Sequence, residues 1–203
     1  MALIKSISGI RGTIGGKYRE NFTPQDIVEC AAAFGYWTLQ KTNNPKIIVG
    51  RDARISGEVV SHLVITTLRM LGIDVVDLGL STTPTVEIAV PLEEAGAGII
   101  FTASHNPRQW NALKFINHKG EFISKTDGQE VLDLIESNEI DYAKVDDLGG
   151  YVRKKDYIKQ HIQHILDLPL VDVDAVKAKQ YKVVVDVVNS TGAISIPNLL
   201  NKL

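Results

Sequence analysis

The chain has a single cysteine, Cys30, among its 203 residues. One cysteine can form neither a disulfide within the chain nor a zinc site with several cysteine ligands. No apolar stretch approaches the ~20 residues that a membrane-spanning helix needs, and residues 1–5 lack the charged segment and long apolar core of a signal peptide. We therefore expect no membrane partner, and the cytoplasm is the default location.

Positive and negative side chains are nearly equal in number, with 22 Lys and Arg residues and 24 Asp and Glu residues. A nucleic-acid-binding protein usually has a clear basic excess, so we expect no nucleic-acid partner. Neither a P-loop nor a dinucleotide-binding glycine fingerprint occurs, so no nucleotide cofactor is expected. With 44% hydrophobic residues, the chain can form one good core and part of another.

Strand-like and helix-like segments alternate along the chain, which predicts an α/β fold. Thr23 and Pro24 are typical of a helix start, Ser56 is predicted to cap a second helix, and Gly72 suits the position just beyond its end. Helices are predicted at residues 24–42, 57–71, from 83 onward and at 127–137, and strands at 46–49, 74–80, 98–101, 113–116 and 121–123, the last two paired across 117–120.

Gly149 and Gly150 follow an acidic stretch and predict a domain boundary, which divides the chain into 1–150 and 151–203. Beyond it we expect a helix over 151–168, a strand over 182–188 and a helix over 193–203. The strand is apolar on both faces, as is typical of strands covered by helices on both sides. One strand and one helix cannot make a domain, so we expect a truncated second domain. An unpaired apolar strand also predicts self-association through residues 182–188.

Residues 102–107, Thr-Ala-Ser-His-Asn-Pro, follow the predicted strand 98–101. Open α/β sheets bind ligands beyond the carboxyl ends of their strands, so Ser104 is a candidate nucleophile. Side chains of adjacent residues usually diverge, so His105 is not expected to deprotonate Ser104 directly. The flanking glycines of a hydrolase nucleophile elbow are missing. Taken alone, the segment is equally well explained as an Asn-Pro turn with a capping serine.

Three further segments carry polar residues beside glycine or at the start of a predicted strand. They are residues 8–12, Ser-Gly-Ile-Arg-Gly; residues 50–57, Gly-Arg-Asp-Ala-Arg-Ile-Ser-Gly; and residues 110–114, Trp-Asn-Ala-Leu-Lys. Each has an ordinary alternative: a plain turn for the first, mutual charge pairing for the second and a solvated edge lysine for the third. An arginine in a tight glycine loop can also bind a phosphate with two parallel hydrogen bonds.

Taken together, the four segments resemble those of the α-D-phosphohexomutases, which move phosphate between C1 and C6 of a hexose. The resemblance implies that Ser104 carries the transferred phosphoryl group and that Lys114 and Arg11 are active-site cations. Residues 50–57 would support the active-site edge structurally. The chain departs from the family at Ala112, where glycine is usual, and at residues 5–7, where Phe-Gly-Thr is common.

The resemblance also implies the fold and the reaction. We expect a three-layer α/β/α sandwich with a mixed sheet, followed by a linker helix and an incomplete second α/β domain. The reaction would be a reversible transfer through phosphoserine and a bisphosphorylated hexose, with hexose bisphosphate as activator. Glucosamine phosphate is the leading substrate, with glucose or mannose phosphate next, and this chain alone is expected to be inactive. The alternative function is a noncatalytic phosphosugar-binding domain.

The remaining site residues are implied by the same resemblance. It implies a catalytic role for His105 and phosphate or substrate binding by Asn106, Asn111 and Arg11. Mg²⁺ would bind the phosphate on Ser104, and the family's other metal ligands, an Asp-Gly-Asp loop, do not occur in this sequence. Lys114 could stabilise charge or act as a general acid or base. The second role requires it to lose its proton near neutral pH, which a free lysine does not do, and the sequence leaves both roles open.

Overall fold

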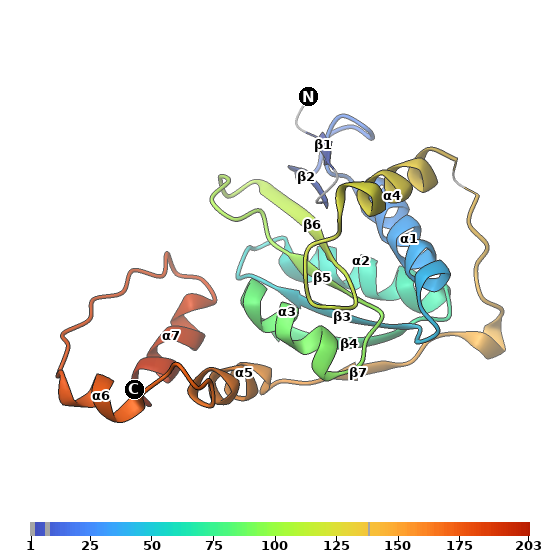
Figure 1. The fold of residues 1–203 in the computed structure, drawn as a ribbon. Coiled ribbons are helices and arrows are strands. Elements are labelled where there is room, and N and C mark those ends of the chain that lie inside the picture. Colours follow the sequence, from blue (N-terminus) through green and yellow to red (C-terminus); the bar gives the residue numbers. More distant parts are fainter. Residues whose placement is uncertain (1–2, 7–8, 138) are drawn as a thin grey trace.

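The computed structural model describes residues 3–6, 9–137 and 139–203 of the chain. Within them, a seven-stranded sheet has the order β1-β2-β6-β5-β3-β4-β7 (Figure 1). Its strands are β1 (Leu3–Ser6), β2 (Gly9–Thr13), β3 (Lys46–Arg51), β4 (Asp74–Leu80), β5 (Ala97–Phe101), β6 (Trp110–Ile116) and β7 (Tyr151–Arg153). Strands β5, β3, β4 and β7 run parallel, whereas β1, β2 and β6 join as antiparallel neighbours. The mixed sheet is thus the one expected.

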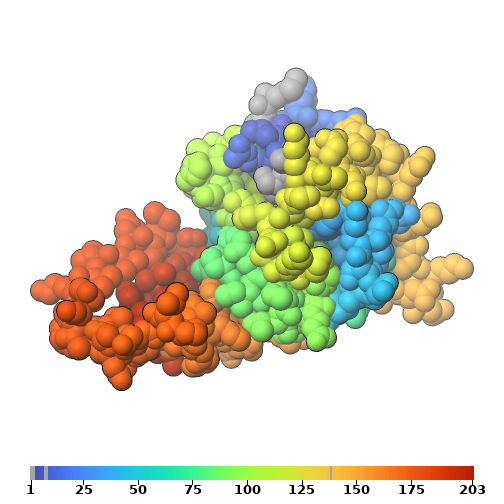
Figure 2. Space-filling view, in the orientation of Figure 1, coloured from blue at the N-terminus to red at the C-terminus, as the bar shows by residue number. Residues whose placement is uncertain are grey.

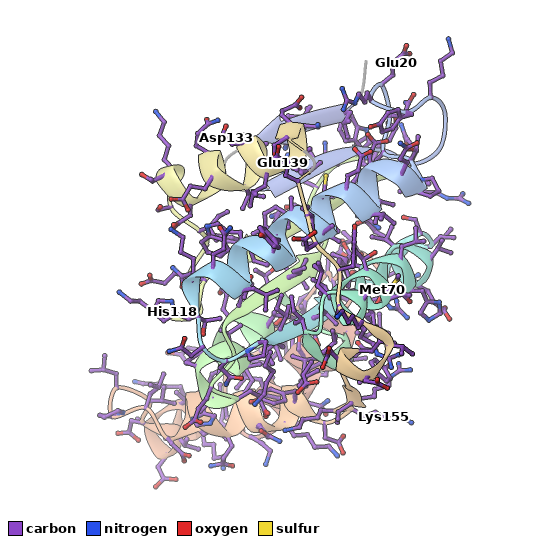
Figure 3. The ribbon with its side chains drawn as sticks, turned by 90° about the vertical axis from the view of Figure 1, so that its right-hand side faces the viewer. Glu20, Met70, His118, Asp133, Glu139 and Lys155 are labelled. Atoms are coloured by element: carbon purple, nitrogen blue, oxygen red, sulfur yellow. The ribbon has the colours of Figure 1, made fainter. Side chains whose placement is uncertain are left out.

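Helices cover both faces of this sheet. On one face lie α1 (Pro24–Lys41), α2 (Gly57–Met70) and α4 (Lys125–Ser137), which Figure 3 shows side by side with α1 in the middle. Their apolar side chains form the larger core with one face of the strands. On the other face, α3 (Thr83–Leu92) and α5 (Tyr157–Leu166) close a smaller core. The predicted three-layer sandwich is confirmed. No helix in the described residues is long and apolar enough to cross a membrane.

The predicted helix ends are confirmed for α1 and for the carboxyl end of α2. Thr23 and Asp26 form a reciprocal capping box at the start of α1, and Pro24 occupies its first turn. Gly72 has φ of +78° just beyond α2, a conformation that glycine adopts without steric cost. Ser56 is the residue before α2, but its side chain makes no capping hydrogen bond. Ser56 therefore occupies the predicted N-cap position, but its hydroxyl accepts from Asn111 instead of capping the helix.

The segment around residue 110 is more regular than the sequence suggested. Strand β6 begins at Trp110, three residues before the predicted start. The predicted pairing of residues 121–123 is reduced to one isolated bridge between Ile116 and Phe122. In the register of β2 and β6, each residue from Trp110 to Lys114 has a partner on β2, for example Asn111 opposite Gly12. The whole segment 110–114 therefore lies within the sheet.

The helix predicted from residue 151 begins only at Tyr157. Residues 151–153 instead form β7, which pairs with the outer edge of β4, Val75 opposite Tyr151. A free parallel edge offers these residues backbone hydrogen bonds that outweigh the local helical pattern. The sheet thus extends three residues beyond the predicted boundary at 150, and the division into two domains remains a prediction.

The strand predicted over residues 182–188 is absent from the structure. These residues have no secondary structure, and the exposed fraction of Val184 reaches 94%. A strand needs a neighbour to pair its backbone, and none lies beside it in the described part of the chain. A short helix not expected from the sequence, α6 (Val173–Ala178), precedes it, and α7 (Gly192–Leu200) comes after it about as predicted. Figure 2 shows this C-terminal segment, residues 173–203, orange to red, as a lobe beside the rest of the molecule.

Candidate functional site

The loop that carries Ser104 connects β5 to β6. Every residue of β5 is buried, so the strand is a fixed support for this loop. Ser104 is exposed, and its backbone has φ of +55°, in the left-handed region. That conformation costs a residue with a side chain about 1 kcal/mol. The hydroxyl of Thr102 accepts from the Ser104 amide at 3.1 Å, so a bond to the end of the strand helps to hold the serine.

His105 lies beside the serine without a strong contact to it. Its Nδ1 is 3.5 Å from Oγ of Ser104, at the outer limit of a hydrogen bond, and both residues are exposed. The next residue, Asn106, is half-buried, and its amide donates to the carbonyl of Ala103 at 3.0 Å in a tight turn. The structure therefore brings Ser104, His105 and Asn106 together on one turn, as the sequence implied.

Arg54, in the loop between β3 and α2, holds this turn from inside. Its Nη1 and Nη2 donate to four carbonyl oxygens of the serine loop at 2.7 to 3.0 Å: those of Ser104, Asn106, Pro107 and Trp110. Its Nε lies 3.2 Å from Oδ2 of Asp52, and only 13% of the side chain is exposed. The Gly-Arg-Asp-Ala-Arg segment predicted structural support here, but the sequence could not indicate which carbonyls converge on the guanidinium.

A cavity of about 650 Å³ opens beside the serine loop. Ser104, His105 and Arg108 line one side, Asp52 and Arg54 another, and residues 188–190 of the C-terminal lobe a third. Segments far apart in the sequence therefore meet around the serine hydroxyl, and the space is polar enough for a charged ligand. Arg108 is a cation at this cavity that the sequence reasoning did not single out.

The register of the sheet places Arg11 and Lys114 on one face. Arg11 of β2 is opposite Ala112, and Lys114 of β6 is opposite Gly9, so the two cations are diagonal neighbours on adjacent strands. Gly9 has φ of +137°, and a Cβ there would lie 2.1 Å from the carbonyl oxygen of Leu113. Glycine is thus required where β2 passes Lys114. Ser8, which opens the same motif, lies outside the described residues.

Lys114 is half-buried between aromatic and acidic groups. Its Nζ lies 5.8 Å from the ring centroid of Phe122, close enough for a cation–π contact. Burial raises the pKa of Glu87 on α3, and the charge of Lys114 opposes that rise. Because Lys114 is paired with Ile100 of β5, it lies on the sheet face that carries α3.

Asn111 lies on the opposite face, because residues three apart on a strand point to opposite sides. Its side chain is fully buried and donates to the Ser56 hydroxyl at 2.9 Å. Its Oδ1 accepts from the Ala112 amide at 2.8 Å. In this structure Asn111 joins β6 to the start of α2 and is not open to a ligand.

The described residues do not by themselves offer a metal site. They contain no group of three or more His, Cys, Asp or Glu side chains that could hold a metal ion. Asp52, the carboxylate beside the serine loop, already contacts Arg54 through both of its oxygens. Mg²⁺ bound through a phosphate on Ser104 therefore remains a prediction.

Comparison with known proteins identifies the family to which the chain is similar. Residues 3–141 match the family model described as phosphoglucomutase/phosphomannomutase, alpha/beta/alpha domain I. The chain is 36% identical to a phosphoglucomutase/phosphomannomutase of Thermococcus kodakarensis, covering 95% of this chain and 42% of that protein. It is 31% identical to a phosphoglucosamine/phosphogalactosamine mutase of Sulfurisphaera tokodaii, covering 97% and 42%. It thus spans well under half of the length of these relatives.

Solved structures give the same result for the fold. A putative phosphomannomutase from Thermus thermophilus superposes with a TM-score of 0.67 at 27% identity, covering 82% of this chain and 37% of that one. A phosphoglucomutase/phosphomannomutase family protein from Burkholderia thailandensis superposes with a TM-score of 0.68 at 24% identity, covering 83% and 36%.

Proposed function

The chain belongs to the phosphoglucomutase/phosphomannomutase family, and from this premise we propose that it is the phosphoryl-carrying part of a phosphohexomutase. The observation that carries the proposal is the placement of Ser104. It is exposed on a loop that Arg54 holds by hydrogen bonds, at the carboxyl end of a buried strand and beside a cavity lined by polar side chains. A nucleophile needs this combination of accessibility and fixed position.

In the proposed reaction, phosphorylated Ser104 transfers its phosphoryl group to a hexose monophosphate. The bond between phosphorus and Oγ of Ser104 breaks while the hexose hydroxyl oxygen forms a new bond to phosphorus. The hydroxyl proton passes to a base, and Oγ of Ser104 takes up a proton to become a hydroxyl. The resulting bisphosphorylated hexose reorients in the site and then transfers its other phosphate to Ser104. The serine is thereby restored to its phosphorylated form, and the cycle is reversible.

We assign the two cations on the β2–β6 face to the transferring group. Arg11 can offer two parallel N–H donors to phosphate oxygens, and Lys114 supplies a point charge. Such charges stabilise the negative charge that spreads over the phosphoryl oxygens during transfer. His105 and Asn106 share the turn with Ser104, which supports roles at the same phosphate. We propose that Asn111 positions Ser56 through its hydrogen bond and does not itself contact the substrate.

The proposed substrate is a hexose phosphate. Glucosamine phosphate is the first to assay, with glucose and mannose phosphates next, since the names of the relatives include all three sugars. We propose that Mg²⁺ and a hexose bisphosphate activator are required. The sugar-binding and metal-binding loops are proposed to belong to a longer protein of which this chain is the first part, so the chain alone should not convert the substrate.

Replacing the serine tests the proposal. Ser104→Ala in the proposed longer protein should abolish mutase activity on all three sugars, because the covalent step is lost, whereas Ser137→Ala, at the exposed end of α4, should not. Activity of the Ser104→Ala protein within about tenfold of wild type would overturn the assignment. If instead the unmodified protein binds sugar phosphates, never carries phosphate on Ser104 and has no activity, the alternative of a noncatalytic binding domain holds.

A further inference from the structure

Arg54 donates four hydrogen bonds through its Nη1 and Nη2 to the serine loop, although it has no direct place in the proposed reaction. Its side chain is turned away from the solvent, with 13% exposed, and its donors point at backbone carbonyls rather than into the cavity. A planar guanidinium has five N–H donors in a fixed fork, which a lysine cannot reproduce. The arrangement thus requires arginine specifically.

The contacts fix the direction of two peptide groups in the serine loop. The carbonyls of Ser104 and Pro107 point inward to Arg54, at 2.8 and 2.9 Å. No peptide bond in the described residues is cis, and a trans peptide directs its N–H opposite to its C=O. The amides of His105 and Arg108, which belong to the same two peptide groups, therefore point away from Arg54.

Arg54 is itself fixed by the end of the neighbouring strand. Oδ1 of Asp52 accepts from the Arg54 amide at 2.9 Å, and its Oδ2 faces Nε at 3.2 Å. The Asp52 amide in turn donates to the carbonyl of Phe101, the last residue of β5, at 3.1 Å. Hydrogen bonds at the carboxyl end of β5 thus position both Arg54 and Ser104. The left-handed backbone of Ser104 is held by Thr102 at its amide and by Arg54 at its carbonyl.

We propose that Arg54 is a positioning residue for the phosphoryl group on Ser104, which it serves by turning the amide N–H groups of His105 and Arg108 outward as donors to that group. Backbone N–H groups that point outward from the same loop can together bind an anion. The buried positive charge behind the loop favours the same anion. The role of this anion in phosphoryl transfer rests on the proposed function, but the geometry of the amides does not.

The 203-residue chain allows a test that needs no enzymatic activity. Phosphoserine is incorporated at position 104, and the amide proton shifts of His105 and Arg108 are measured by NMR against the unphosphorylated chain. Both amide protons should move downfield on phosphorylation, as expected for donors to a phosphate. In Arg54→Lys, which keeps the charge but not the fork, this movement should be lost or strongly reduced. Arg69→Ala, which removes another arginine–carbonyl contact, to Gly149, should leave it unchanged.

Two outcomes would overturn the proposal. The first is an equal downfield movement in wild type and Arg54→Lys, both folded by circular dichroism. The second is failure of both Arg54→Lys and Arg54→Ala to fold, which would make Arg54 a residue required for folding.

Kinetics of the proposed longer protein add a separate readout. Arg54→Lys should lower kcat on the order of a hundredfold, with little change in KM, because the loop is misplaced rather than the substrate lost. A rise in KM alone would contradict positioning. An inactive wild-type protein would count against the proposed function, whereas the amide shifts would still decide the role of Arg54.

Discussion

At the level of single residues, the proximity of the two proposed active-site cations depends on strand register. Arg11 and Lys114 are far apart in the sequence, yet they are diagonal neighbours across β2 and β6. Gly9 makes this possible, because any side chain opposite Lys114 would collide with the backbone of β6. The two cations are therefore positioned by the rigid interior of a sheet rather than by a loop, which suits groups that stabilise a transition state.

Lys114→Met in the proposed longer protein tests whether that charge acts on the transferring group. Methionine keeps most of the apolar stem of lysine but removes the ammonium group, so kcat should fall by about a hundredfold or more while KM changes little. Lys119→Met, in the exposed turn after β6, is the control and should behave as wild type. Steady-state kinetics decide the matter. If only KM rises, Lys114 binds the substrate without aiding transfer.

The sequence identified most of these residues, but not their orientation. Strand alternation alone, once residues 110–116 are known to be a strand, places Asn111 and Lys114 on opposite faces. The family resemblance implies substrate or phosphate binding by Asn111, whereas the structure buries its side chain against Ser56. The convergence of loop carbonyls on Arg54 depends on tertiary folding, which no local pattern encodes.

Among the elements, the docking of α5 on α3 links the two parts of the chain. Tyr157 is buried at the start of α5, and burial, with Glu93 nearby, raises its pKa to about 12. Lys154 donates to both carboxylate oxygens of Glu93 at 2.7 Å. One turn further, Nδ1 of His161 lies 2.9 Å from the Thr85 hydroxyl. The linker helix thus contacts the sheet domain through polar as well as apolar groups.

This contact should weaken in mild acid. Burial, and then the charge of His164, lowers the pKa of His161 in the folded protein. The unfolded chain binds a proton near pH 6.5, so as the pH falls below about 6.5 the unfolded state gains a proton that folded His161 resists. The free energy of unfolding should therefore decrease until the pH passes the folded pKa. Urea denaturation at about pH 7.5 and about pH 5.5 measures the decrease.

His161→Gln supplies the comparison, because glutamine cannot take up the proton. Its loss of stability between the two pH values should be smaller than that of wild type. Equal losses in the two proteins would show that groups other than His161 cause the effect.

The elements with a complete local signal were predicted well. Helix α1 has both a capping box and a proline in its first turn, and β5 is apolar throughout. Two of the errors at element level show the effect of strand pairing. Residues 151–153 became a strand because the edge of β4 was free, and residues 182–188 did not, because the described chain offers no neighbour. Availability of an edge is a property of the fold and cannot be read from a short segment.

For the whole molecule, the C-terminal lobe is the part least able to bury its apolar side chains. The exposed fractions of Val183, Val184 and Val188 are 55%, 94% and 82%. An extended apolar segment without backbone partners favours pairing with another chain. We therefore predict concentration-dependent self-association of the 203-residue chain through residues 182–188.

Light scattering on this chain and on one ending at Leu168 tests that prediction. The longer chain should form dimers or larger species, and the shorter one should remain a monomer. Two monomers of equal solubility would contradict it. Substituting Val184 by lysine in the 203-residue chain should also restore the monomer, since a charge on the segment opposes pairing.

The proposed mutase reaction depends on the chemistry of one oxygen, Oγ of Ser104. The most direct measurement tracks phosphate on that atom by mass spectrometry of the proposed longer protein. After incubation with a hexose 1,6-bisphosphate, the peptide containing Ser104 should carry one phosphate. Adding excess hexose monophosphate should then remove it in a single turnover, with hexose bisphosphate appearing in equal amount. Mutase activity with the phosphate on another residue, or with none on the protein, would contradict the central claim.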